Sequence, residues 1–124
     1  MEFTPETFMR AQTNPHEHQA AILKALAHPF RLRLLCELAR EEECVCHLAA
    51  LFGKPQPYVS QQLGELKDAG FLLDRRDGHR TYYRLADDRV VPLLALIEEI
   101  AGAPAAVPEA PRESICDCPR PDYA

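Results

Sequence analysis

The chain has 124 residues, a length that suits one domain, or one domain followed by a tail. Its 19 acidic and 14 basic side chains give a formal net charge of −5, which taken alone argues against nonspecific binding to nucleic acids. The apolar runs are far shorter than a membrane span, and residues 1–10 do not resemble a secretory signal. We therefore expect a cytoplasmic protein with reduced thiols and no contact with a membrane.

Three helices are predicted in the N-terminal part of the chain. Thr4 and Asn14 are each followed by a proline and a nearby acidic residue, a pattern typical of a helix start. The first helix is expected to end near residue 11, and Pro29 interrupts the second. Apolar residues at helical spacing predict a third helix over residues 30–40.

The next segment, residues 43–52, is predicted to be a short helix with two thiols in its first turn. Cys44 and Cys46 are two positions apart, which on a regular helix separates side chains by about 200°. We therefore expect the two sulfurs to point to opposite sides of the helix. One metal ion would then bind both only if this end of the helix distorts.

A second helix after a tight turn is predicted from Pro57 to about residue 69, with polar residues at its N-terminus. A short helix, a turn and such a second helix describe a helix-turn-helix. Base and phosphate contacts from this helix are predicted for Gln56, Tyr58, Ser60 and Gln61.

Two strand-like segments follow, residues 71–75 and 80–85, with an Asp77-Gly78 turn signal between them. A helix-turn-helix followed by a basic hairpin is a winged helix. The hairpin tip is predicted to reach the DNA backbone through Arg76, His79 and Arg80. We thus predict a mainly α domain with a β-hairpin wing over residues 1–102.

The last helix is predicted over residues 89–101, and its apolar residues cover more than one face. A terminal helix of this kind needs a partner beyond its own small domain, so we expect a homodimer formed through the terminal helices. Five prolines in residues 103–124 predict a tail without regular structure. The tail carries a second Cys-x-Cys pair, Cys116 and Cys118.

These motifs together resemble the ArsR/SmtB family of bacterial metal-sensing repressors. The resemblance implies a winged-helix homodimer that binds double-stranded operator DNA near its own promoter and leaves it on binding a metal or another inducer. No His, Asp and Ser constellation with catalytic spacing appears in the sequence, so we expect neither an enzyme nor an organic cofactor. The segments that carry the resemblance are residues 24–31, 44–48, 56–63, 66–72, 74–78 and 82–85.

The sequence also departs from the family pattern. His47 replaces the acidic residue that often follows Cys-Val-Cys, and we expect it to be exposed on its helix, with a role as a fifth donor to the ion as the alternative. Gln61 and Gln62 stand where many members have His-Leu. Residues 87–101 contain no histidine, so the zinc site that some members carry on the last helix is not expected.

Soft thiolates suit soft ions, and a helix N-terminus favours a thiolate. We therefore predict one site formed by Cys44, Cys46 and one or both of Cys116 and Cys118, whereas Cys36 is expected to pack in the core. Three sulfurs would bind arsenite or antimonite, and four would suit cadmium or lead. Arsenite is favoured because the first cysteine pair and the entry to the wing look most like the arsenic-responsive branch of the family. Structural cysteines, or a thiol-redox sensor without metal, remain as alternatives.

The predicted mechanism is a displacement of the DNA-reading helix on ion binding. Drawing Cys44 and Cys46 onto one ion would unwind the first turn of their helix and displace the DNA-reading helix behind it. Binding of the ion and of the operator would then oppose each other reciprocally.

Overall fold

The computed structural model describes residues 14–102, so the predicted first helix and the tail with Cys116 and Cys118 lie outside the described part of the chain. None of the helices in residues 14–102 is long and apolar enough to cross a membrane. The elements in order are α2 (Pro15–Leu26), α3 (Pro29–Leu38), β1 (Glu43–Cys44), α4 (Val45–Phe52), α5 (Gln56–Asp68), β2 (Leu72–Asp77), β3 (Arg80–Leu85) and α6 (Val90–Ala101).

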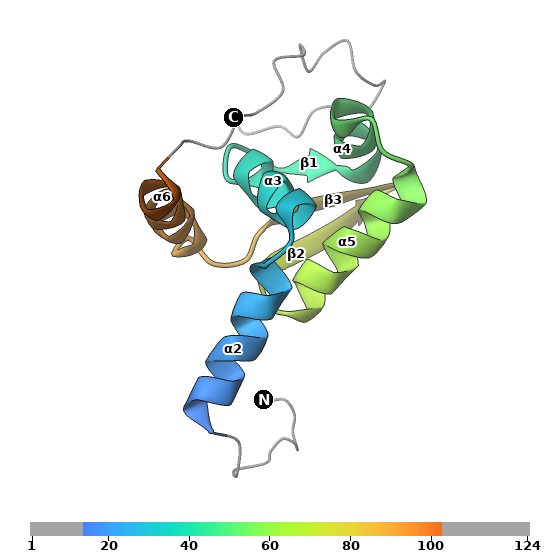
Figure 1. Ribbon diagram of the computed structural model, residues 1–124. Helices are drawn as coiled ribbons and strands as arrows, with labels where there is room; N and C mark the ends of the chain where they lie inside the picture. Colours follow the sequence, from blue (N-terminus) through green and yellow to red (C-terminus); the bar gives the residue numbers. More distant parts are fainter. Residues whose placement is uncertain (1–13, 103–124) are drawn as a thin grey trace.

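The centre of the fold is a three-stranded antiparallel sheet with the order β1-β3-β2, against which α3, α4 and α5 pack (Figure 1). Helix α2 projects from this body, and α6 lies on the side of α3 away from α5 (Figure 1). The apolar side chains with no exposed surface come from the three central helices and are Leu34, Leu35, Leu48, Val59, Leu63 and Leu66. The hydrophobic core therefore sits beneath the helix-turn-helix and holds α5 against the sheet.

The predicted helix boundaries are largely confirmed. The Asn14 side chain accepts a hydrogen bond of 2.7 Å from the His16 N–H at the start of α2, as an N-cap should. Pro29 opens α3, and the His28 side chain caps it by accepting from the Phe30 N–H. Gly53 ends α4 in the left-handed region with φ 64°, so the turn before α5 begins where the sequence indicated.

The wing is also confirmed as an antiparallel hairpin. Its strands pair from Leu72 opposite Leu85 to Asp77 opposite Arg80, which leaves Gly78 and His79 as the two-residue turn. Gly78 has φ 64°, the conformation that such a tight turn requires.

Strand β1 was not predicted. Glu43 lies opposite Tyr83, and Cys44 lies opposite Tyr82, so the residues just before α4 add a third strand to the wing sheet. A strand of two residues is too short to show the alternation that identifies strands in a sequence. Its position depends on β3, which comes much later in the chain.

Candidate functional site

Cys44 lies just outside α4, because its backbone is extended, with φ −86° and ψ 157°, and pairs with β3. It is the N-cap of the helix, and its sulfur accepts a hydrogen bond of 3.4 Å from the His47 N–H. The prediction that the sulfurs of Cys44 and Cys46 point apart is therefore wrong, because the 200° rotation applies only within a helix. The two sulfurs lie 3.1 Å from each other.

This separation suits shared coordination of one ion. Two thiolates on one tetrahedral metal at about 2.3 Å lie about 3.8 Å apart, so a small adjustment brings both sulfurs to one ion. Helix α4 need not unwind for this. Within residues 14–102 no group of three or more Cys, His, Asp or Glu side chains could hold a metal ion, so this pair supplies two donors and further ligands would come from elsewhere.

His47 is buried, with 2% of its side chain exposed, so the prediction of an exposed histidine is wrong. Its Nε2 lies 3.7 Å from Oε1 of Glu43, whose side chain is 1% exposed. The reason is that β1 turns Glu43 inward, beneath the first turn of α4, where the imidazole meets it. Cys44 is thus held between a strand pairing and a buried polar pair.

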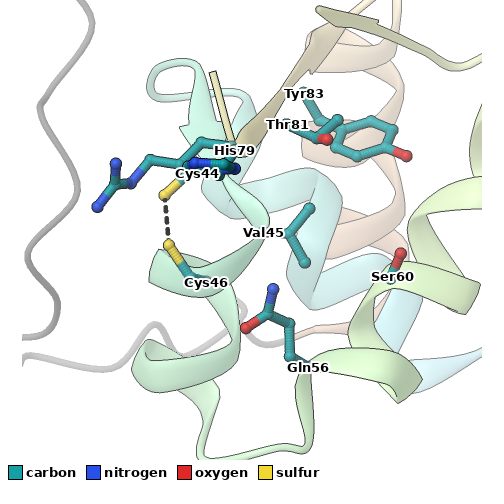
Figure 2. A pocket seen from close by; sticks show the side chains of 9 residues that line it. Cys44, Val45, Cys46, Gln56, Ser60, His79, Thr81 and Tyr83 are labelled. Atoms are coloured by element: carbon teal, nitrogen blue, oxygen red, sulfur yellow. Dashed lines mark hydrogen bonds between the residues drawn. The ribbon is translucent and has the colours of Figure 1, made fainter. Parts of the chain in front are cut away.

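A pocket of about 380 Å³ opens beside the two cysteines (Figure 2). The start of α4 forms one wall, the N-terminal part of α5 forms another, and the wing strand β3 forms the third. The lining residues are Cys44, Val45, Cys46, Gln56, Ser60, His79, Arg80, Thr81 and Tyr83. The structure therefore places the thiol pair between the two elements that a winged helix presents to DNA.

The predicted DNA-contacting residues divide into two groups. Gln56, Ser60, His79 and Arg80 line the pocket, and the Nε of Arg80 is buried without a hydrogen-bond partner among the described residues. Gln61, Arg76 and Tyr58 do not line it.

Gln61 and Arg76 are exposed, so a DNA ligand could reach them. Tyr58 is half-buried, with its ring centroid 5.4 Å from that of Phe30. Gln62, by contrast, is buried, and its Oε1 accepts a hydrogen bond of 2.8 Å from the Arg31 Nε. Gln61 is therefore the glutamine of this pair that can face a ligand.

The pairing of Glu42 with Arg75 was not predicted from the sequence. Both guanidinium nitrogens Nε and Nη2 of Arg75 donate to the Glu42 carboxylate, at 3.0 and 2.9 Å. The Arg75 guanidinium also lies over the Tyr82 ring, 4.6 Å from its centroid. Burial raises the pKa of Tyr82, and the neighbouring Cys44 adds to this effect when its sulfur is charged. Glu42 is one of three consecutive glutamates, and such a run gives no sequence signal that one of them pairs with a residue 33 positions away.

A family model described as "Bacterial regulatory protein, arsR family" matches residues 28–72, from the cap of α3 to the start of the wing. The biofilm growth-associated repressor of Agrobacterium fabrum is 45% identical over 85 residues, which cover 68% of this chain and 73% of that protein. This chain belongs to the ArsR family. Membership makes this ArsR-family protein a DNA-binding transcriptional regulator and not an enzyme.

Two further relatives bear on how this ArsR-family protein works. The homodimeric winged helix-turn-helix domain of Mb0332 from Mycobacterium bovis has a TM-score of 0.64 and 35% identity, over 75% of this chain and 90% of that one. The arsenic resistance transcriptional regulator ArsR1 of Pseudomonas putida is 45% identical over 65 residues, 52% of this chain and 51% of that protein.

Proposed function

We propose that this protein is a repressor that binds operator DNA as a homodimer and releases it when a soft ion binds the thiolates of Cys44 and Cys46. The observation that carries the proposal is the 3.1 Å separation of the two sulfurs at the edge of the pocket between α5 and the wing. Arsenite or antimonite is the favoured inducer, in keeping with the name of the P. putida relative. Cys116, Cys118 or both would complete the site.

The position of Cys44 and Cys46 explains why an ion bound there would affect DNA binding. Gln56 and Ser60 begin the reading helix, and His79 and Arg80 form the wing side of the same pocket. In a winged helix the reading helix enters the major groove, while the wing contacts the neighbouring backbone or minor groove. A DNA strand that joins these two contacts passes over the mouth of the pocket.

The mechanism we propose does not require α4 to unwind. A trivalent or divalent soft ion supplies a strong bond to each thiolate that it joins, including thiolates from distant parts of the chain. Cys44 and Cys46 would hold such an ion at the α4 wall of the pocket, whose other walls are α5 and β3, so the distance between the reading helix and the wing would change. Because DNA requires one fixed distance, occupation of the site and DNA binding oppose each other.

The terminal helices support the homodimer. Leu23 on α2 is 57% exposed, and Leu96 and Ile100 on α6 are 54% and 86% exposed, so the isolated protomer leaves apolar side chains in water. Replacing Ile100 by Glu should shift the protein from dimer to monomer in sedimentation experiments without unfolding it, because this side chain packs on nothing within the described protomer. A dimer of unchanged stability would exclude α6 from the interface.

The proposal is tested by measuring operator affinity while titrating arsenite, antimonite, cadmium, lead and zinc in reducing buffer. We expect arsenite or antimonite to weaken wild-type binding by about tenfold or more, within the usual range of coupling between two sites. The Cys44→Ser/Cys46→Ser variant should bind the operator in all conditions. Cys36→Ala is the matched control, since it removes a thiol remote from the pocket and should respond like the wild type.

The same titration decides between inducers. Release by cadmium or lead but not by arsenite would identify the four-sulfur alternative. A second candidate, a thiol-redox-sensing repressor, is also favoured by the short distance between the sulfurs. Release by a mild thiol oxidant in the presence of a chelator, with no response to any ion, would establish that candidate and refute the metal proposal.

A further inference from the structure

The thiol site and the wing belong to one sheet. In the register of the three strands, Cys44 lies opposite Tyr82, and Tyr82 lies opposite Arg75. One row across β1, β3 and β2 thus joins a proposed ion ligand to the outer strand of the wing. Backbone hydrogen bonds between the strands connect the two ends of this row.

A side-chain link spans the same row. Glu42, two residues before Cys44, accepts two parallel hydrogen bonds from Arg75 at 3.0 and 2.9 Å. Between them lies Tyr82, which is 2% exposed and has the Arg75 guanidinium over its ring. A bidentate pair of this kind constrains both the distance and the angle between its partners.

Glu42 is poorly suited to contact DNA directly. Its side chain is 8% exposed, and a carboxylate repels the phosphate backbone. The partner Arg75 is 45% exposed and gains a raised pKa, chiefly through its hydrogen bond to Glu42. The pair therefore fastens a wing strand to the segment that carries the thiols, and its acidic member does not read the operator.

We propose that Glu42 is a positioning residue that ties the wing to the strand of Cys44, so that the wing follows the state of the thiol pair. The inference deepens the proposed function and rests on it. Without this link, the thiol site still binds its ion, but β2 no longer moves with Cys44. Ion binding then lowers the operator affinity by a smaller factor.

The chain offers a matched control on the same strand. Asp74, the neighbour of Arg75, pairs with Lys67 of α5 at 3.0 Å. This ion pair also fastens β2, but to the reading helix and not to the segment of Cys44. A variant at Asp74 therefore loosens the wing in general and leaves the link to the thiols intact.

The experiment compares Glu42→Gln with Asp74→Asn in the full-length dimer. The measured quantity is the ratio of operator dissociation constants with and without saturating arsenite, or whichever ion releases the wild type. We expect the ratio to fall about fivefold or more in Glu42→Gln, toward 1, and to stay near the wild-type value in Asp74→Asn. Binding of the ion to the protein without DNA should stay near that of the wild type in both variants.

A double-mutant cycle tests whether Glu42 acts through Arg75. The ratio of dissociation constants should fall by the same factor in Glu42→Gln, in Arg75→Gln and in the double variant, because each removes the same link. Additive losses would overturn the inference. So would a wild-type ratio in Glu42→Gln, or an equal loss in Asp74→Asn.

Failure of the proposed function would look different, since the wild type itself would then respond to no ion. Amide hydrogen exchange of residues 72–85 decides the inference in that case, because it needs no inducer. Faster exchange of these residues in Glu42→Gln, with α4 and α5 unchanged, supports the tie. Unchanged exchange in the wing overturns it.

Discussion

The cysteines within residues 14–102 lie in two contrasting regions. Cys36 lies half-buried on α3, packed against the core, and burial together with the nearby Glu98 carboxylate raises the pKa of its thiol. Cys44 and Cys46 lie where a strand turns into α4, beside a pocket and against a buried polar pair. The contrast shows that the surroundings of a thiol decide its chemistry, because the thiolate is the form that binds metals and attacks electrophiles.

The largest expected effect is on stability, because the region of Cys44 and Cys46 contains a buried polar pair. Replacing His47 by Ala leaves the Glu43 carboxylate buried without its imidazole, which we expect to lower the free energy of unfolding by about 1–3 kcal/mol. Cys36→Ala removes only a half-buried small side chain and should cost less than about 1 kcal/mol. Urea denaturation at one fixed protein concentration measures both, since dimerisation affects apparent stability. Equal costs would remove the contrast between the two regions.

The next effect concerns thiol reactivity in reducing buffer. Cys46 is half-buried in the first turn of α4, whereas the raised pKa of Cys36 lowers its thiolate fraction at neutral pH. We expect iodoacetamide to modify Cys46 about tenfold faster than Cys36 at pH 7.5, as followed by peptide mass measurement. The rate at Cys36 should go on rising above pH 9, because a raised pKa moves its titration to higher pH. Faster modification of Cys36 at neutral pH would contradict this assignment.

The smallest expected effect concerns the contribution of Glu98 to the raised pKa of Cys36. Glu98→Gln removes the carboxylate charge that helps to raise the pKa of Cys36, while burial, the larger cause, remains. The modification rate of Cys36 should increase about twofold to threefold at pH 8, since one pKa unit corresponds to about tenfold in thiolate. The rate of Cys46 serves as the internal control and should not change. An unchanged rate at Cys36 would assign its shift to burial alone.

The sequence by itself determined the helix-turn-helix, the wing and the choice of Cys44 and Cys46 as candidates. Each of these depends on neighbours in the chain: Asn14 and Pro29 place helix starts, Gly53 ends α4, and Asp77-Gly78 closes the hairpin. Such signals act over a few residues, because caps and turns satisfy local backbone groups and local dihedral preferences.

Only the tertiary structure decided how the two thiols are presented. Tyr82, far along the chain, draws Cys44 into β1 and out of α4, and this brings its sulfur to 3.1 Å from that of Cys46. The same pairing buries His47 against Glu43 and lets Glu42 reach Arg75, 33 positions away. A regular helix predicts diverging sulfurs, whereas pairing with a distant strand overrides the local preference of two residues. The physical reason is that strand pairing and burial depend on partners brought together only by the fold.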